Sequence, residues 1–134
     1  MAESTRLVDL IQLRIDEFLS ERSAELGVIA PELTELTEVA RSFLAGGKRF
    51  RALFCYWGWQ ATLGDDLGFD PSADEDSSDL PAIVHAAAAL EVFHAAALVH
   101  DDIMDNSDTR RGSPAAHRRF ETLHRELDWS GRSG

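Results

Sequence analysis

The sequence of 134 residues has a single cysteine, Cys55, which excludes an internal disulfide framework and suits a reducing compartment. Basic residues are also scarce: 13 Lys and Arg face 24 Asp and Glu, for a formal net charge of −11. A general nucleic-acid-binding protein needs a basic surface to neutralise phosphates, so the charge excludes that class. The longest apolar stretch, residues 86–99, contains Glu91 and His94 and is too short to span a bilayer. Charges interrupt residues 1–18, so no signal peptide is expected. The sequence predicts a cytoplasmic chain without a transmembrane segment.

Lys and Arg are absent from residues 52–109, which contain twelve Asp and Glu. Lys48, Arg49 and Arg51 precede this stretch, and Arg110 and Arg111 follow it. If the fold brings both basic clusters near the carboxylates, they form a site for a metal and a multiply charged anion. Charge alone does not distinguish this from an acidic chain with a lysine-poor segment.

Apolar residues recur at helical spacing, no segment alternates like a strand, and the length suffices for one core. The pattern predicts an all-α antiparallel helical bundle, with helices at residues 7–26 (ending at Gly27), 31–44, 48–63, from a cap at Asp79 to the aspartates near 101, and 113–127. The fourth helix is apolar on almost every side, as expected of a central helix. Residues 65–79 are rich in Asp, Ser, Pro and Gly and are predicted to form a mobile loop.

The first chemical motif is Asp101-Asp102-Ile103-Met104-Asp105. Residues four apart share a helix face, so the side chains of Asp101 and Asp105 are expected about 5–6 Å apart. Mg²⁺ takes one or two carboxylates together with phosphate oxygens and water. Carboxylates at a helix C-terminus oppose the helix dipole, and such a departure from stability is typical of a functional site. The motif therefore indicates a Mg²⁺ site, with a solvated helix end as the alternative.

The second motif is Gly46-Gly47-Lys48-Arg49-Phe50-Arg51. Its glycines allow backbone amides to approach an anion at a helix N-terminus, and Lys48 and Arg51 can project to one side. This chemistry suits a diphosphate, although the spacing is not that of a P-loop. An ordinary loop with solvated basic residues is the alternative, as a core histidine is for His94, two turns before Asp101.

In this order and spacing, GGKRFR and EVFHAAALVHDDIMDNSDTRRGSPAAH resemble the trans-isoprenyl diphosphate synthases, the polyprenyl synthetase family. The resemblance covers about residues 36–120. It implies the all-α isoprenoid synthase fold, with residues 1–134 as the amino-terminal fragment of one domain, and usually a homodimer. The implied reaction condenses an allylic diphosphate with isopentenyl diphosphate to a longer trans-polyprenyl diphosphate and releases pyrophosphate.

Matching positions imply the site residues. Asp101 and Asp105 resemble the Mg²⁺ ligands, with Asp102 as a secondary catalytic candidate. Arg110 resembles the residue that holds the allylic diphosphate. The residues matching those that hold isopentenyl diphosphate are Lys48, Arg51, His94 and Arg111.

The family resemblance also bears on product length. In the family, a bulky residue four or five positions before the first aspartate limits the growing chain. Those positions are Ala97 and Ala96 here, and Phe93 is the first aromatic residue further back. The expected product is longer than farnesyl, with geranylgeranyl favoured.

The family's second aspartate-rich motif is absent from the sequence, so the 134 residues alone are expected to be an inactive fragment. A non-catalytic scaffold or regulatory subunit remains an alternative, although it has little use for both the aspartates and the arginines. A terpene cyclase is a second alternative, but it would not be expected to carry GGKRFR.

Overall fold

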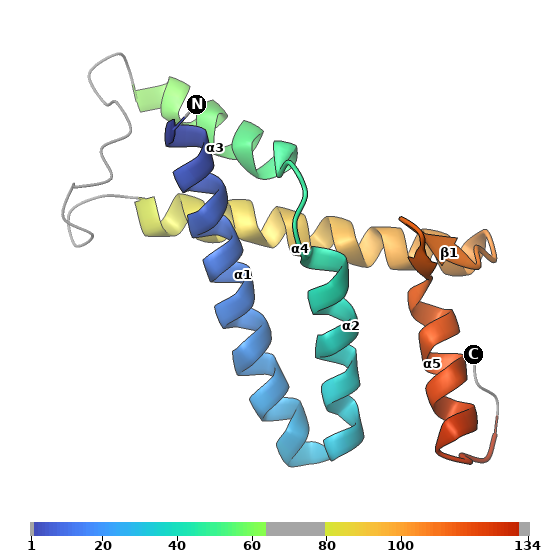
Figure 1. The fold of residues 1–134 in the computed structure, drawn as a ribbon. Coiled ribbons are helices and arrows are strands. Elements are labelled where there is room, and N and C mark those ends of the chain that lie inside the picture. Colours follow the sequence, from blue (N-terminus) through green and yellow to red (C-terminus); the bar gives the residue numbers. More distant parts are fainter. Residues whose placement is uncertain (1, 64–79, 132–134) are drawn as a thin grey trace. The chain divides into compact units, whose positions relative to one another are not determined.

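The computed structural model describes residues 2–63 and 80–131 (Figure 1). The predicted mobile loop at 65–79 and the predicted cap at Asp79 lie outside the described residues. The chain forms two compact units, Met1–Phe93 and His94–Gly134.

The amino-terminal unit opens with two antiparallel helices, α1 (Ala2–Ile29) and α2 (Thr34–Leu44), joined by the short 3-10 helix η1 (Pro31–Leu33) (Figure 1). The prediction that the first helix ends at Gly27 is wrong. The N–H of Ala30 still donates to the carbonyl oxygen of Leu26 at 3.0 Å, so the helical pattern passes Gly27. The chain turns at Ala30, which is extended (φ −158°), as the residue before a proline prefers.

The core of this unit follows one face of α1. Four apolar residues at four-residue spacing are buried there: Leu7, Ile11, Ile15 and Leu19. This spacing places them on one stripe, and α1 contacts α2, η1 and α3. Burial of each such side chain contributes about 1.5–3 kcal/mol, so the stripe holds the unit together. The other helices contribute buried apolar residues, among them Val39, Leu44, Ala52, Tyr56, Ile83, Val84, Ala87 and Ala88.

The third helix, α3 (Phe50–Leu63), begins two residues after its predicted start. The backbone ahead of it has positive φ at Gly46 (+66°), Gly47 (+100°) and Arg49 (+49°), which is incompatible with a right-handed helix. The basic residue Lys48 therefore lies in a loop rather than in the helix.

The long helix α4 (Leu80–Met104) runs from the first unit into the second. In the first unit one face is buried, including Ala87, Ala88 and Glu91, whereas Leu90 and Phe93 are exposed. The helix is apolar on almost every side, but in this unit the face with Leu90 and Phe93 is uncovered by the described residues.

Helix α4 is also long and apolar enough to cross a membrane, because it extends well beyond the stretch 86–99 considered in the sequence. Core helices of soluble proteins meet the same criterion, so a single such helix is weak evidence. Its middle residue Glu91 forms a buried ion pair with Arg49, as expected of a helix that packs against protein.

The carboxyl-terminal unit contains the end of α4, a small hairpin of β1 (Thr109–Arg110) and β2 (Ser113–Pro114), and α5 (Ala116–Glu126). Arg110 pairs with Ser113, and the two residues between them, Arg111 and Gly112, have φ of +51° and +81°. Positive φ at both central positions is typical of the type I′ hairpin turn. No strand was predicted, because two-residue strands are too short to alternate. The pairing of Ser113 and Pro114 also delays the start of the last helix to Ala116. Helices dominate the described residues, and the all-α class is confirmed.

Candidate active site

The predicted metal ligands lie at the C-terminal end of α4. The N–H of Asp105 donates to the carbonyl oxygen of Asp101 at 2.9 Å, so the two residues are one helical turn apart on one side. Both side chains are exposed. The next residue, Asn106, has φ +52° and ends the helix. The geometry presents two carboxylates to solvent, one helical turn apart.

Asp102 is oriented differently from its neighbours. It is 1% exposed and accepts two hydrogen bonds from Arg110, at 2.7 Å from Nε and 2.6 Å from Nη2. These bonds and the positive charge of Arg110 hold the pKa of Asp102 below its usual value, although burial opposes this shift. Asp102 therefore remains ionised and fixes the Arg110 guanidinium. Its predicted role as a catalytic carboxylate stays a prediction, and the geometry favours a positioning role.

The hairpin places the two arginines of the second unit in different surroundings. The Arg110 side chain is 26% exposed, and its Nη2 lies 4.0 Å from Oδ2 of Asp101. Arg111 occupies the exposed tip of the turn. Arg110 thus lies beside the carboxylate pair, as a ligand for a metal-bound anion should.

The segment that joins the aspartates to the hairpin is held by Arg118 of α5. Its guanidinium bonds Oδ1 of Asp108 at 2.8 Å, Oδ1 of Asn106 at 3.1 Å and the carboxylate of Glu121 at 2.8 Å. The N–H of Ala115 also donates to the carbonyl of Asp108 at 3.0 Å. Arg118 has no distinguishing signal in the sequence, because it is one of two adjacent arginines, Arg118 and Arg119, in a helix.

In the first unit, Lys48 and Arg51 are both exposed. The Nζ of Lys48 lies 5.8 Å from the centre of the Phe50 ring. A Cβ added at Gly46 or Gly47 would meet nothing within 4 Å among the described residues, so the space in front of the glycines is open. Lys48 in the loop and Arg51 in the first turn of α3 offer two exposed cations beside accessible backbone, which is the chemistry expected of a diphosphate site.

The remaining predicted positions lie along α4. In the first unit, Phe93 is 73% exposed and borders an apolar pocket of about 260 Å³ between α1 and α4, with Phe18 and Val92. In the second unit, His94 is half-buried, and Ala96 and Ala97 are exposed.

The carboxylates at the end of α4 suit Mg²⁺ bound together with a substrate. Among residues 2–63 and 80–131, no three His, Cys, Asp or Glu side chains gather into a complete metal site. Mg²⁺ does not require such a cage, because it keeps waters and uses substrate phosphates as ligands. Asp101 and Asp105 supply the one or two carboxylates that this mode of binding needs.

The fold and these residues define an all-α protein with an exposed carboxylate pair and two basic loops suited to diphosphates. The family model named Polyprenyl synthetase matches residues 33–124. The chain belongs to the polyprenyl synthetase family.

Individual relatives agree with this assignment. The chain is 38% identical over 101 residues to geranylgeranyl pyrophosphate synthase 9, chloroplastic, of Arabidopsis thaliana, covering 72% of this chain and 24% of that protein. It is 36% identical over 113 residues to geranylfarnesyl diphosphate synthase of Natronomonas pharaonis, covering 80% and 31%. The chain thus spans a quarter to a third of these relatives.

A solved structure is similar as well. It is geranylgeranyl pyrophosphate synthase from Corynebacterium glutamicum, complexed with isoprenyl diphosphate and magnesium. The TM-score is 0.75 and the identity 34%, with 96% of this chain and 34% of that chain covered.

Proposed function

We propose that the protein is a prenyltransferase that condenses an allylic diphosphate with isopentenyl diphosphate, releases pyrophosphate and forms a trans-polyprenyl diphosphate. The observation that carries this proposal is the exposed pair of Asp101 and Asp105 with Arg110 fixed beside it. The family match and the names of the relatives support it. A geranylgeranyl product is favoured, because relatives of that name recur.

In this proposal, Asp101 and Asp105 would hold Mg²⁺ when the allylic diphosphate is bound. The metal supplies Lewis-acid stabilisation of the charge that develops on the leaving diphosphate. Arg110 donates to the same diphosphate through the donors that Asp102 leaves unused. As the allylic C–O bond breaks, its electron pair leaves with pyrophosphate. The double bond of isopentenyl diphosphate then forms the new C–C bond, which leaves a cation on the isopentenyl unit. That cation loses a proton from the neighbouring carbon to the released pyrophosphate, and the product's new double bond forms.

The second diphosphate is assigned to a separate set of residues. Lys48 of the glycine loop and Arg51 of α3 bind the diphosphate of isopentenyl diphosphate. The family resemblance adds His94 and Arg111 to these proposed ligands. The apolar side chains of α4 exclude water, so that the isopentenyl double bond captures the allylic cation.

The activity is tested on the full-length protein with isopentenyl diphosphate, geranyl or farnesyl diphosphate, and Mg²⁺. We expect elongated products, with one pyrophosphate released for each isopentenyl unit and no turnover after chelation of the metal. A protein that folds, binds Mg²⁺ and leaves both substrates unchanged contradicts the proposal and favours a scaffold subunit. Conversion of the allylic substrate without isopentenyl diphosphate indicates a cyclase.

Product length is tested at Ala96, which is exposed on α4 one turn after Phe93. A phenylalanine there should block the growing chain, so Ala96→Phe should shift the main product at least one isopentenyl unit shorter. Ala61→Phe, which adds the same ring to an exposed position of α3, is the control and should leave the product unchanged. An unaltered chromatogram for Ala96→Phe contradicts the assignment of Phe93, Ala96 and Ala97 to chain length.

We also propose that the protein is a cytoplasmic homodimer. The free cysteine and the family resemblance support these assignments. Light scattering of the purified protein at increasing concentration measures the oligomeric state, and a strict monomer contradicts the dimer.

A further inference from the structure

Arg49 stands between the two proposed diphosphate ligands, but its side chain is oriented differently. Lys48 and Arg51 are exposed, whereas Arg49 is 6% exposed. Its backbone has φ +49°, an uncommon value for a residue other than glycine. The chain therefore adopts a strained conformation that places this one guanidinium in the interior.

The buried guanidinium of Arg49 joins three helices to the loop. Nη1 lies 3.3 Å from Oε2 of Glu91 on α4. Nη2 donates to Oε1 of Gln12 on α1 and to the carbonyl oxygen of Leu44, the last residue of α2. The bond to Leu44 satisfies one of the carbonyls that a helix C-terminus leaves without a partner.

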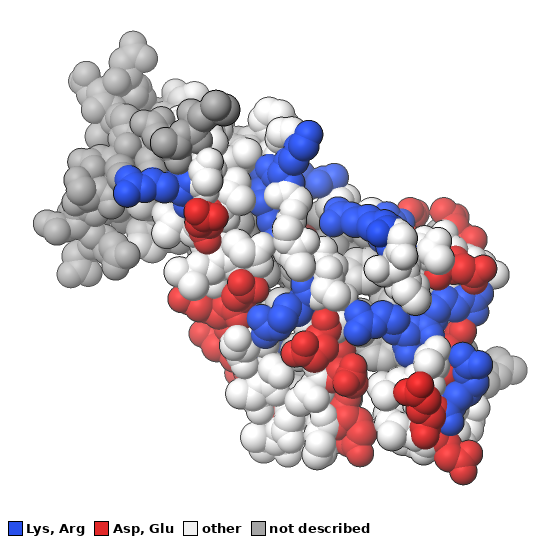
Figure 2. Space-filling model, in the orientation of Figure 1, with Lys and Arg blue, Asp and Glu red and all other residues white. Residues whose placement is uncertain are grey.

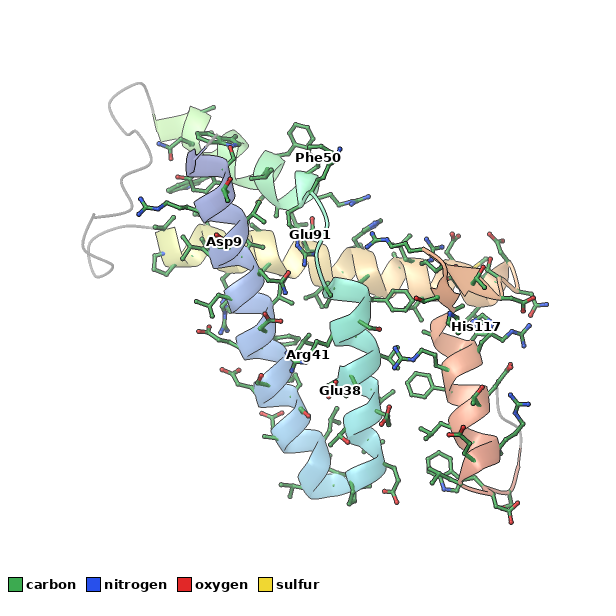
Figure 3. The ribbon with its side chains drawn as sticks, viewed as in Figure 1. Asp9, Glu38, Arg41, Phe50, Glu91 and His117 are labelled. Atoms are coloured by element: carbon green, nitrogen blue, oxygen red, sulfur yellow. The ribbon has the colours of Figure 1, made fainter. Side chains whose placement is uncertain are left out.

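Glu91 of α4, labelled in Figure 3, links the guanidinium of Arg49 to the start of α3. It is 7% exposed, and its Oε1 accepts the backbone N–H of Ala52 in the first turn of α3 at 3.4 Å. One carboxylate therefore holds both the residue before α3 and the first turn of α3. Glu91 thus holds Arg49, the residue after Lys48, and Ala52, the residue after Arg51.

Stability alone does not account for this arrangement. The desolvation cost of a buried ion pair largely offsets its attraction, and apolar residues of similar size often serve the fold as well. An ion pair differs from an apolar contact in its directionality: its hydrogen bonds fix the position and rotation of the groups that they join. Here they fix the backbone on which Lys48 and Arg51 stand.

We infer that Arg49 and Glu91 form a positioning clamp that orients Lys48 and Arg51 toward isopentenyl diphosphate. This inference rests on the proposed function and adds two residues that touch neither substrate. The clamp acts through the loop, so its loss should weaken binding of isopentenyl diphosphate while the allylic site is unaffected.

The test compares Arg49→Lys and Glu91→Gln with the wild-type full-length protein. Arg49→Lys keeps the positive charge but removes the planar fork of donors, and Glu91→Gln keeps the size but removes the negative charge, so each weakens the directed contacts. We expect the KM for isopentenyl diphosphate to rise roughly tenfold, because small misplacements of a binding group are costly. The KM for the allylic diphosphate and kcat should change less than about twofold. Hydrogen exchange of residues 45–52 should accelerate at least about tenfold, since the segment loses its restraint.

Arg41→Lys is the matched control. Arg41, labelled in Figure 3 beside Glu38, forms ion pairs with Asp16 at 3.5 Å and with Glu38 at 3.8 Å. It is partly exposed, and these ion pairs include no residue of the clamp. Arg41→Lys should change neither the KM for isopentenyl diphosphate, nor the KM for the allylic diphosphate, nor the rate of hydrogen exchange of residues 45–52. If Arg49→Lys and Glu91→Gln do not fold, Gln12→Leu removes only one bond of the clamp and should change the same two quantities in the same direction, by a smaller factor.

The outcomes separate the clamp from the proposed function. Faster exchange of residues 45–52 with an unchanged KM for isopentenyl diphosphate overturns the positioning role. Unchanged exchange overturns the clamp itself. If the wild-type protein condenses no substrates, the proposed function fails, and the exchange measurement still decides whether the clamp holds the loop.

Discussion

Two arginines of this chain bind carboxylates of α4, one in each unit, and they do so differently. Arg49 makes a single contact with Glu91 at 3.3 Å, and both side chains are buried. Arg110 makes two hydrogen bonds with Asp102 at 2.6 and 2.7 Å, but only the carboxylate is buried. Arg110 remains partly exposed beside Asp101.

Arg49 and Arg110 have the same charge, so their different burial decides what each of them can do. Arg49 has its donors directed inward and can only position its neighbours. Arg110 is held along one edge by Asp102 and can offer its other donors to an anion. Near the first loop, Arg49 holds the backbone while Lys48 and Arg51 are free to bind an anion. In the second loop, Arg110 is held by Asp102 and can also bind an anion itself.

The largest effect on activity should come from the exposed carboxylates at the end of α4, beside Arg110. Asp101→Asn removes a proposed Mg²⁺ ligand, and we expect kcat to fall at least about 100-fold, because electrostatic stabilisation of the leaving group is lost. Asp9→Asn removes the same charge from the exposed surface of α1 and should leave kcat unchanged. Steady-state kinetics at saturating substrates measures both. An Asp101→Asn enzyme with wild-type kcat contradicts the metal assignment.

A smaller effect should follow from breaking the pair that holds Arg110. Asp102→Asn leaves the amide in place but removes the charge, and we expect the free energy of unfolding to fall by about 2 kcal/mol, since hydrogen bonds to a charged group are lost. Urea denaturation measures the change.

The control is Glu38→Gln in the α1–α2 hairpin. Acidic side chains lie over the α1–α2 hairpin on the face shown in Figure 2. Glu38 is exposed and pairs with Arg41 at 3.8 Å. Exposed pairs contribute little, so we expect less than about 0.5 kcal/mol. Equal losses for the two variants contradict the argument from burial.

The smallest effect is the pH dependence of the same pair. The pKa of Asp102 is lower in the folded protein than in the unfolded chain, so its ionised form stabilises the fold. That contribution is fully present above about pH 5, well above the unfolded pKa of about 3.9. It is lost as the pH falls through the lower folded pKa. The difference in unfolding free energy between wild type and Asp102→Asn should therefore be constant from pH 5 to 7 and shrink below about pH 4. A difference that already vanishes at pH 6 contradicts the assignment.

Much of the fold could be predicted from the sequence. Apolar residues recur every three or four positions in α1 and α2, and a long apolar run that ends at the aspartates marks α4. The start of α3 could not be predicted, since it depends on positive φ at Arg49, which no residue type announces. The hairpin at Arg111-Gly112 was missed because its strands are two residues long.

The site was predictable only where the signal is local. The spacing of Asp101 and Asp105 places them on one side of a helix, and the structure shows this. Adjacent residues on a helix are rotated by about 100°, so Asp102 must point elsewhere. Its partner Arg110 could not be deduced, because the hairpin brings it back. The pairing of Arg49 with Glu91 joins residues 42 positions apart, and sequence alone does not distinguish Arg49 from Lys48 and Arg51.

The most direct test is whether Lys48 and Arg110 bind different diphosphates. The measurement is the KM for each substrate in full-length variants Lys48→Gln and Arg110→Gln. We expect Lys48→Gln to raise the KM for isopentenyl diphosphate about tenfold or more and to leave the allylic KM within about twofold, and we expect Arg110→Gln to do the reverse. Variants that raise both KM values equally, or neither, contradict this assignment.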